Sequence, residues 1–216
     1  TWSLSVEEQF YLFFPVFLFF CYSFFRKYII HIVVILFFLS ICFAAWGSTN
    51  FPSLNFYILP TRGWELLAGA FLAKLETFKI RPANKKINEM FIFLGLILIG
   101  YSVVFFNDEM FHPSFYTLPP IIGVMLIIWF SNKKEIITKI LSSKFFVGTG
   151  LISYSLYLWH FPIFSFARIK HPSISDYDKL EIIVASILLS ILSFFLIEKP
   201  FRNKKTVSKK FLLTSV

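Results

Sequence analysis

Long apolar runs, separated by short polar stretches, recur along the whole chain. Each run is long enough, or nearly so, for a helix to cross a hydrocarbon layer of roughly 30 Å. The pattern predicts seven membrane-spanning helices, at 10–25, 28–46, 56–73, 90–106, 115–130, 145–167 and 182–197. The predicted fold is therefore all-α, a polytopic transmembrane helix bundle, because a helix satisfies its own backbone hydrogen bonds in lipid.

The composition supports a membrane protein and excludes an ordinary soluble domain. Of 216 residues, 57% are hydrophobic and only 15% are charged, and the mean hydropathy is +0.72. These values lie well outside the usual range of soluble domains. Cys21 and Cys42 fall inside apolar runs, where a buried thiol is ordinary, so no redox role is predicted. No metal site is expected.

The net charge of +9 reports the orientation of the chain in the membrane. If the first residue lies outside, most Lys and Arg fall in the inner loops, as the positive-inside rule requires. The basic residues left for the outer side are Arg62, Arg168, Lys170 and Lys179. We therefore expect the N-terminus of this chain outside, its C-terminus inside, and no nucleic-acid partner.

The seven predicted spans form one domain, residues 1–205. An odd number of spans that begins outside predicts further spans upstream. At the other end, residues 206–216 finish in FLLTSV after a basic stretch, which is typical of the start of a further span or of a tail. The sequence therefore predicts a fragment of a longer protein.

Two carboxylates, Glu7 and Glu8, stand directly before the first apolar run. Ser5 and Glu8 fit a capping box, in which both side chains satisfy backbone N–H groups at a helix start. Glu7 instead shares a helix face with Ser3 and Tyr11, at the i, i+4 spacing. A functional role for Glu7 and a simple interaction with the helix dipole both remain open.

Two further polar groups fall within predicted spans, where an ionisable side chain costs a few kcal/mol and is a candidate for function. Arg62 and Glu65 are three residues apart and can pair, for a site or only to lock the bundle. Ser153, Tyr157 and His160 follow one helical stripe, for a site or for hydrogen bonds between helices. The predicted topology puts these groups and Glu7 toward the outer side, bordering one polar cavity.

Four ordered motifs resemble the acyltransferase-3 family of bacterial integral-membrane acyltransferases, of the O-antigen acetylase type. They are TWSLSVEEQFYLFFP, TRGWELLAGAFLA, ISYSLYLWHFPIF and IEKPFRN. Together they extend from residue 1 to about residue 205. The resemblance implies about ten spans in the whole protein, which agrees with three spans upstream of these seven.

The resemblance also assigns roles to particular residues. It implies catalytic roles for Glu7, Arg62 and Glu65. Substrate-binding roles are implied for Trp2, Ser3, Tyr11, Trp64, Ser153, Tyr157, Trp159 and His160. The family's catalytic His, and an arginine pair associated with the acyl donor, are expected upstream of Thr1. His160 belongs to a different motif and does not replace that His.

The function implied by the resemblance is transfer of an acyl group, commonly acetyl, from cytoplasmic acyl-CoA to a hydroxyl of a cell-envelope glycan. The expected acceptor is O-antigen, exopolysaccharide, peptidoglycan or a lipid-linked glycan, and the expected location is the bacterial inner membrane, in contact with its lipid. The 216 residues alone are expected to be inactive. A transporter or flippase of an envelope precursor and a decayed remnant without activity remain alternatives.

Overall fold

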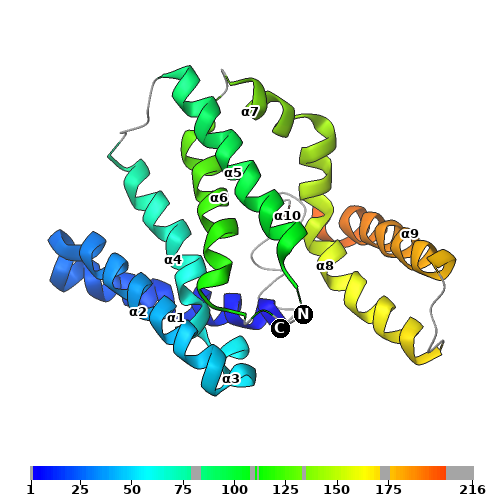
Figure 1. The fold of residues 1–216 in the computed structure, drawn as a ribbon, viewed down its shortest axis with the longest axis horizontal. Helices are drawn as coiled ribbons and strands as arrows, with labels where there is room; N and C mark the ends of the chain where they lie inside the picture. The colour runs from blue at the N-terminus through cyan, green and yellow to red at the C-terminus, as the bar shows by residue number, and fades with distance from the viewer. Residues whose placement is uncertain are drawn as a thin grey trace. The chain divides into compact units, whose positions relative to one another are not determined.

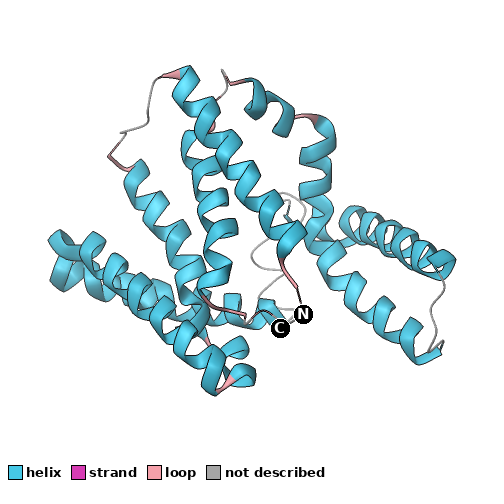
Figure 2. Cartoon of the chain, in the orientation of Figure 1, coloured by secondary structure: helices cyan, strands magenta, loops and turns pink. Residues whose placement is uncertain are grey.

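The computed structural model describes residues 2–78, 84–107, 110, 112–132, 135–170 and 176–202. Within these ranges every regular element is a helix, as Figure 2 shows. The chain divides into two compact units, one of residues 2–140 and one from Leu141 onward. Each unit is described by itself.

The first unit consists of helices joined by short connections. Its helices are α1 (Trp2–Phe25), α2 (Ile29–Asn50), α3 (Pro52–Tyr57), α4 (Leu59–Glu76), α5 (Lys85–Phe105), α6 (Leu118–Phe130) and α7 (Ile136–Leu141), which reaches the unit boundary. Single 3-10 turns, Arg26–Tyr28 and Phe115–Thr117, precede α2 and α6. A proline occupies the first turn of α3, α4 and α6, where its missing N–H leaves no bond unmade.

Helix α4 is the centre of the first unit. It packs along α2 and also contacts α1 and α6, while α5 packs along α6 (Figure 1). Its buried face includes Trp64, Leu67, Ala68 and Leu72, which follow the spacing of one helical stripe. Trp64 is completely buried, with the edge of the Phe37 ring against it at a centroid distance of 5.9 Å.

The second unit is a pair of helices with a short continuation. Helix α8 (Lys144–Lys170) packs against α9 (Asp176–Ser193), which continues as a π-helical turn, Phe194–Glu198, and α10 (Lys199–Arg202). Pro162 lies inside α8, and Figure 1 shows this helix changing direction along its length. A kink is the expected effect of a proline that removes one hydrogen bond of the helix.

All seven predicted apolar runs lie in helices, which confirms the all-α prediction. Three stretches are long and apolar enough to cross a membrane: Leu4–Asn50, which holds both α1 and α2, Lys85–Phe105 and Tyr177–Arg202. Phe115–Phe130 is apolar but shorter. Helices α4 and α8, which hold the predicted spans at 56–73 and 145–167, lie outside this set. The 18 residues of α4 include four charged ones, Arg62, Glu65, Lys74 and Glu76.

Two local predictions at helix ends are wrong. Helix α1 has already begun at Trp2, so Ser5 lies inside the helix and cannot cap it. The stretch 47–55, which separates the predicted spans 28–46 and 56–73 and was therefore expected to be a loop, is largely helical, because α2 continues to Asn50 and Pro52 starts α3. Residues 206–216, predicted to begin a further span, lie outside the described residues.

Candidate functional site

A small charged pocket lies where α1 meets the start of α4. Glu7 of α1 and Arg62 and Glu65 of α4 line it, together with the apolar side chains of Val6 and Leu66. Its volume is about 30 Å³, which is room for about one water molecule or one substrate hydroxyl. The structure thus brings together the three residues to which a catalytic role was assigned.

The two terminal nitrogens of the Arg62 guanidinium differ in their hydrogen bonds. Nη2 donates to Oε2 of Glu65 at 3.2 Å, which confirms the predicted pair. The guanidinium carbon lies 5.2 Å from the centroid of the Phe56 ring. Nη1 is buried and has no hydrogen-bond partner among the described residues. A buried donor left without a partner costs about 1–3 kcal/mol, so a bound water, hydroxyl or oxyanion would be stabilising here.

Side chains from two neighbouring helices hold the first turns of α4. The amide of Gln9, on α1, accepts from the Leu59 N–H at 3.3 Å and donates to the Tyr57 carbonyl at 3.4 Å. The hydroxyl of Ser40, on α2, donates to the Pro60 carbonyl at 2.6 Å and accepts from the Trp64 N–H at 3.0 Å. Sequence reasoning missed both residues, because their partners lie on another helix and no spacing within one helix points to them.

Asn55 is a third polar residue that the sequence analysis missed. It is 1% exposed, and its Nδ2 donates to the carbonyls of Ala44 and Pro113, each at 3.1 Å. The Thr61 hydroxyl donates to the Asn55 carbonyl at 2.5 Å. Asn55 thereby ties α2, the segment before α6 and the start of α4 together. A cue was present, since Asn55 stands in a run of aromatic and aliphatic residues.

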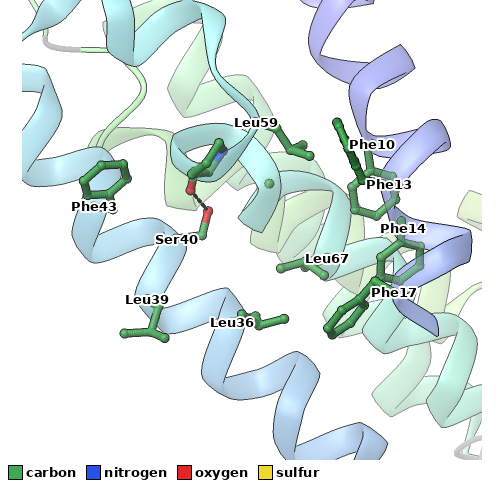
Figure 3. Close-up of a pocket in the computed structure, with 12 residues that line it drawn as sticks. Phe10, Phe13, Phe14, Phe17, Leu36, Leu39, Ser40, Phe43, Leu59 and Leu67 are labelled. Atoms are coloured by element: carbon green, nitrogen blue, oxygen red, sulfur yellow. Dashed lines mark hydrogen bonds between the residues drawn. The ribbon is translucent and has the colours of Figure 1, made fainter. Parts of the chain in front are cut away.

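An apolar groove adjoins the charged pocket. Four Phe side chains of α1 face residues of α2 and α4 across a volume of about 440 Å³ (Figure 3). Helix α4 contributes Arg62 to the charged pocket and Gly63, the next residue, to the groove. The lining of the groove is almost entirely hydrocarbon. It suits apolar chains or helices and provides no reactive group.

The structure places two other predicted residues of the first unit, Tyr11 and Trp64, away from the pocket. Tyr11 is 65% exposed and is not in the pocket lining, although it was predicted to share a face with Glu7. Trp64 packs the interior and leaves no surface for a ligand to stack on. The side chains of Trp2 and Ser3 lie outside the described residues.

The predicted stripe of α8 lines a second, open groove. Ser153, Tyr157 and His160 share it with α9, across a volume of about 380 Å³. A ring nitrogen of His160, Nδ1, lies 3.1 Å from the Leu156 carbonyl. This contact lies within one helix, so the predicted hydrogen bond between helices and the predicted site at His160 both stay predictions. Trp159 is 37% exposed and is not in the lining.

Within the second unit, residues of two family motifs, ISYSLYLWHFPIF and IEKPFRN, bond to each other. The hydroxyl of Ser155, on α8, donates to Oε2 of Glu198 at 3.1 Å, and Arg202 Nη1 donates to Oε1 of the same carboxylate at 3.2 Å. Glu198 lies in the π-helical turn, a local geometry often found at functional sites. Sequence reasoning quoted both motifs but did not predict this contact.

The predicted cavity shared by all these polar groups is still a prediction for Tyr157 and His160. Glu7, Arg62 and Glu65 share one pocket, while Tyr157 and His160 line a groove of the other unit. In the described ranges no group of three or more His, Cys, Asp or Glu side chains could hold a metal ion.

The fold and site define a multi-pass membrane protein with a charged pocket among its helices. A family model described as an acyltransferase domain matches residues 1–200, so the chain belongs to the acyltransferase-3 family. This confirms the resemblance drawn from the four motifs. No solved structure gave a significant match.

Several relatives match 94% of this chain, which spans about a third of their length. The peptidoglycan O-acetyltransferase OatA of Listeria monocytogenes is 32% identical, and the chain covers 35% of it. SACOL0978 of Staphylococcus aureus, named as an O-acetyltransferase, is 31% identical with 36% covered. YrhL of Bacillus subtilis, named for peptidoglycan O-acetylation, is 29% identical with 34% covered.

Proposed function

We propose that this chain is part of a membrane enzyme that transfers an acetyl group from cytoplasmic acetyl-CoA to a hydroxyl of peptidoglycan. The observation that carries the proposal is the family match over residues 1–200. Two relatives are named for peptidoglycan O-acetylation, which favours peptidoglycan over O-antigen or exopolysaccharide. The positive-inside pattern supports a location in the cytoplasmic membrane with the charged pocket toward the outside.

The charged pocket would position the acceptor. Arg62 Nη1, buried without a partner in the described part of the chain, would donate to a glycan hydroxyl or to the oxyanion that forms as the acetyl group transfers. Glu7 would accept from the reacting hydroxyl, and Glu65 would hold the guanidinium in place. The bond between the acetyl carbon and the sulfur of acetyl-CoA would break as the acetyl carbon bonds to the glycan oxygen. The family's His, expected upstream of Thr1, would move the hydroxyl proton to the departing thiolate.

The test uses cells that lack the gene and are complemented with the full-length protein. Base-released acetate from purified peptidoglycan is measured, with membrane abundance of each variant as the normalisation. Arg62→Ala should lower acetate by about a hundredfold, the scale of losing one donor to a developing oxyanion. Glu7→Gln should also lower acetate, because the neutral amide is a weaker acceptor for the reacting hydroxyl than the carboxylate. Glu8→Gln should retain wild-type acetylation, because Glu8 is exposed and outside the pocket lining.

Three outcomes contradict parts of the proposal. Undiminished acetylation in Glu7→Gln and Arg62→Ala at normal abundance removes these residues from the site. Failure of the wild-type protein to restore any acetate supports the remnant without activity. A third outcome is that cells with these variants export less glycan but acetylate normally the glycan that reaches the surface. This outcome supports a transporter.

A further inference from the structure

The start of α4 contains an unusual hydrogen-bond arrangement. In an α-helix the N–H of one residue bonds directly to the carbonyl four residues earlier, and Trp64 stands four residues after Pro60. The hydroxyl of Ser40 contacts both groups, at 2.6 Å from the Pro60 oxygen and 3.0 Å from the Trp64 nitrogen. Figure 3 shows the Ser40 side chain reaching from α2 to this carbonyl.

The turn that Ser40 bridges carries Arg62, one of the three charged residues of the pocket. Arg62 stands midway between Pro60 and Trp64, and Glu65 follows directly. This end of α4 has little support of its own, since Ile58 makes no side-chain capping bond within the described residues and Pro60 has no N–H. Its ties to other helices are Gln9 from α1, Ser40 from α2 and the Asn55 carbonyl of α3, which accepts from Thr61. Of these, the Ser40 tie spans the turn that holds Arg62, because Ser40 bonds to both Pro60 and Trp64.

The Ser40 bridge is protected from water. Ser40 is 8% exposed. A Cβ built on Gly63 would lie 3.7 Å from the Ser40 oxygen, an ordinary contact, so the bridge does not require a glycine at this position. A hydrogen bond in such surroundings is electrostatically stronger than one in water. The bridge therefore fixes both the distance between α2 and α4 and the rotation of the turn that presents Arg62.

We propose that Ser40 is a positioning residue that holds the Arg62 turn of α4 so that the guanidinium faces Glu7. The inference rests on the proposed function and adds a residue from a third helix to that site. Ser40 touches no substrate in this mechanism. It acts through Arg62, which would contact the acceptor, and Glu65, which holds the Arg62 guanidinium.

The test is a steady-state assay of the full-length protein in native membranes, with acetyl-CoA as donor and a soluble peptidoglycan oligosaccharide as acceptor. In Ser40→Ala the Pro60 carbonyl and the Trp64 N–H can bond directly, so α4 stays helical and abundance stays normal. We expect kcat to fall about tenfold while KM for donor and acceptor stays within about twofold. Ser40→Thr keeps the hydroxyl and should restore at least half of the wild-type kcat.

Ser48→Ala is the matched control. Ser48 is also buried, at 4% exposure, and also lies on α2, but its hydroxyl donates to the Ala45 carbonyl of its own helix. It should keep wild-type kcat and KM. Wild-type kcat in Ser40→Ala overturns the inference, and so does an equal loss in Ser40→Thr. Loss of folded protein that accounts for all the lost activity also overturns it. If the wild-type protein itself transfers no acetate, the proposed function has failed.

Discussion

At the scale of single residues, two facing glycines set the distance between α5 and α6. A Cβ built on Gly95 would lie 2.6 Å from the Gly123 carbonyl oxygen, and one on Gly123 would lie 2.7 Å from the Gly95 oxygen. Both obstacles are backbone atoms, which cannot rotate away. Small residues at such contacts let helix backbones approach closely, and close packing is the main source of helix association in a membrane.

Gly95→Ala is therefore expected to push α5 and α6 apart and to lower the free energy of unfolding by about 1–3 kcal/mol, the usual scale of overpacking. Thermal unfolding of the purified full-length protein in detergent measures this loss. Gly100→Ala is the control on the same helix, since a Cβ there meets nothing within 4 Å in the described part of the chain. Equal melting temperatures for the two variants would contradict the close contact.

At the scale of elements, the α2–α3–α4 connection depends on a buried amide. Asn55 reaches back to Ala44 and across to Pro113, and a Cβ on Gly47 would lie 2.5 Å from its Oδ1. These contacts hold the short helix α3 against the end of α2. The chain then enters α4 in the orientation that places Arg62 and Glu65 beside α1.

Asn55→Ala should destabilise the first unit by about 2–3 kcal/mol, because it leaves two carbonyls without their donor. Limited proteolysis and thermal unfolding in detergent both report this change. Asn50→Ala is the control, since the Asn50 amide is exposed and bonds only within its own helix. A melting temperature of Asn55→Ala as high as that of Asn50→Ala would contradict a structural role for the buried amide.

At the scale of the molecule, stability in acid depends on a carboxylate outside the spanning helices. Glu135, just before α7, is 1% exposed and accepts from Asn88 Nδ2 of α5 at 3.0 Å. Burial by itself raises the pKa of Glu135. Hydrogen bonds from the Asn88 side chain and from backbone groups, with the charge of Lys85, outweigh it, so the pKa lies below its ordinary value.

The unfolded chain therefore binds a proton at Glu135 at a higher pH than the folded chain does. The carboxylate contributes its full stabilisation above the ordinary pKa, and this contribution is lost as the pH falls through the lowered value. Melting temperature measured against pH should fall less steeply in acid for Glu135→Gln than for the parent. Glu181→Gln, an exposed position on α9, should keep the parent's pH dependence, and an unchanged slope in Glu135→Gln would contradict the assignment.

The sequence by itself determined the all-α class, the seven apolar helices and the pairing of Arg62 with Glu65. Hydrophobic periodicity and i, i+3 spacing both act within one helix, so they can be recognised from the order of residues alone. The motifs also determined the family.

Only the tertiary structure decided which helices bring their polar groups together. The convergence of Glu7 with Arg62, the bridge from Ser40 and the tie from Asn55 join residues far apart in the chain. The complete burial of Trp64 depends in the same way on neighbours that its own helix does not specify. These contacts follow from the packing of α1, α2 and α4, and the spacing along one chain does not contain the distances between helices.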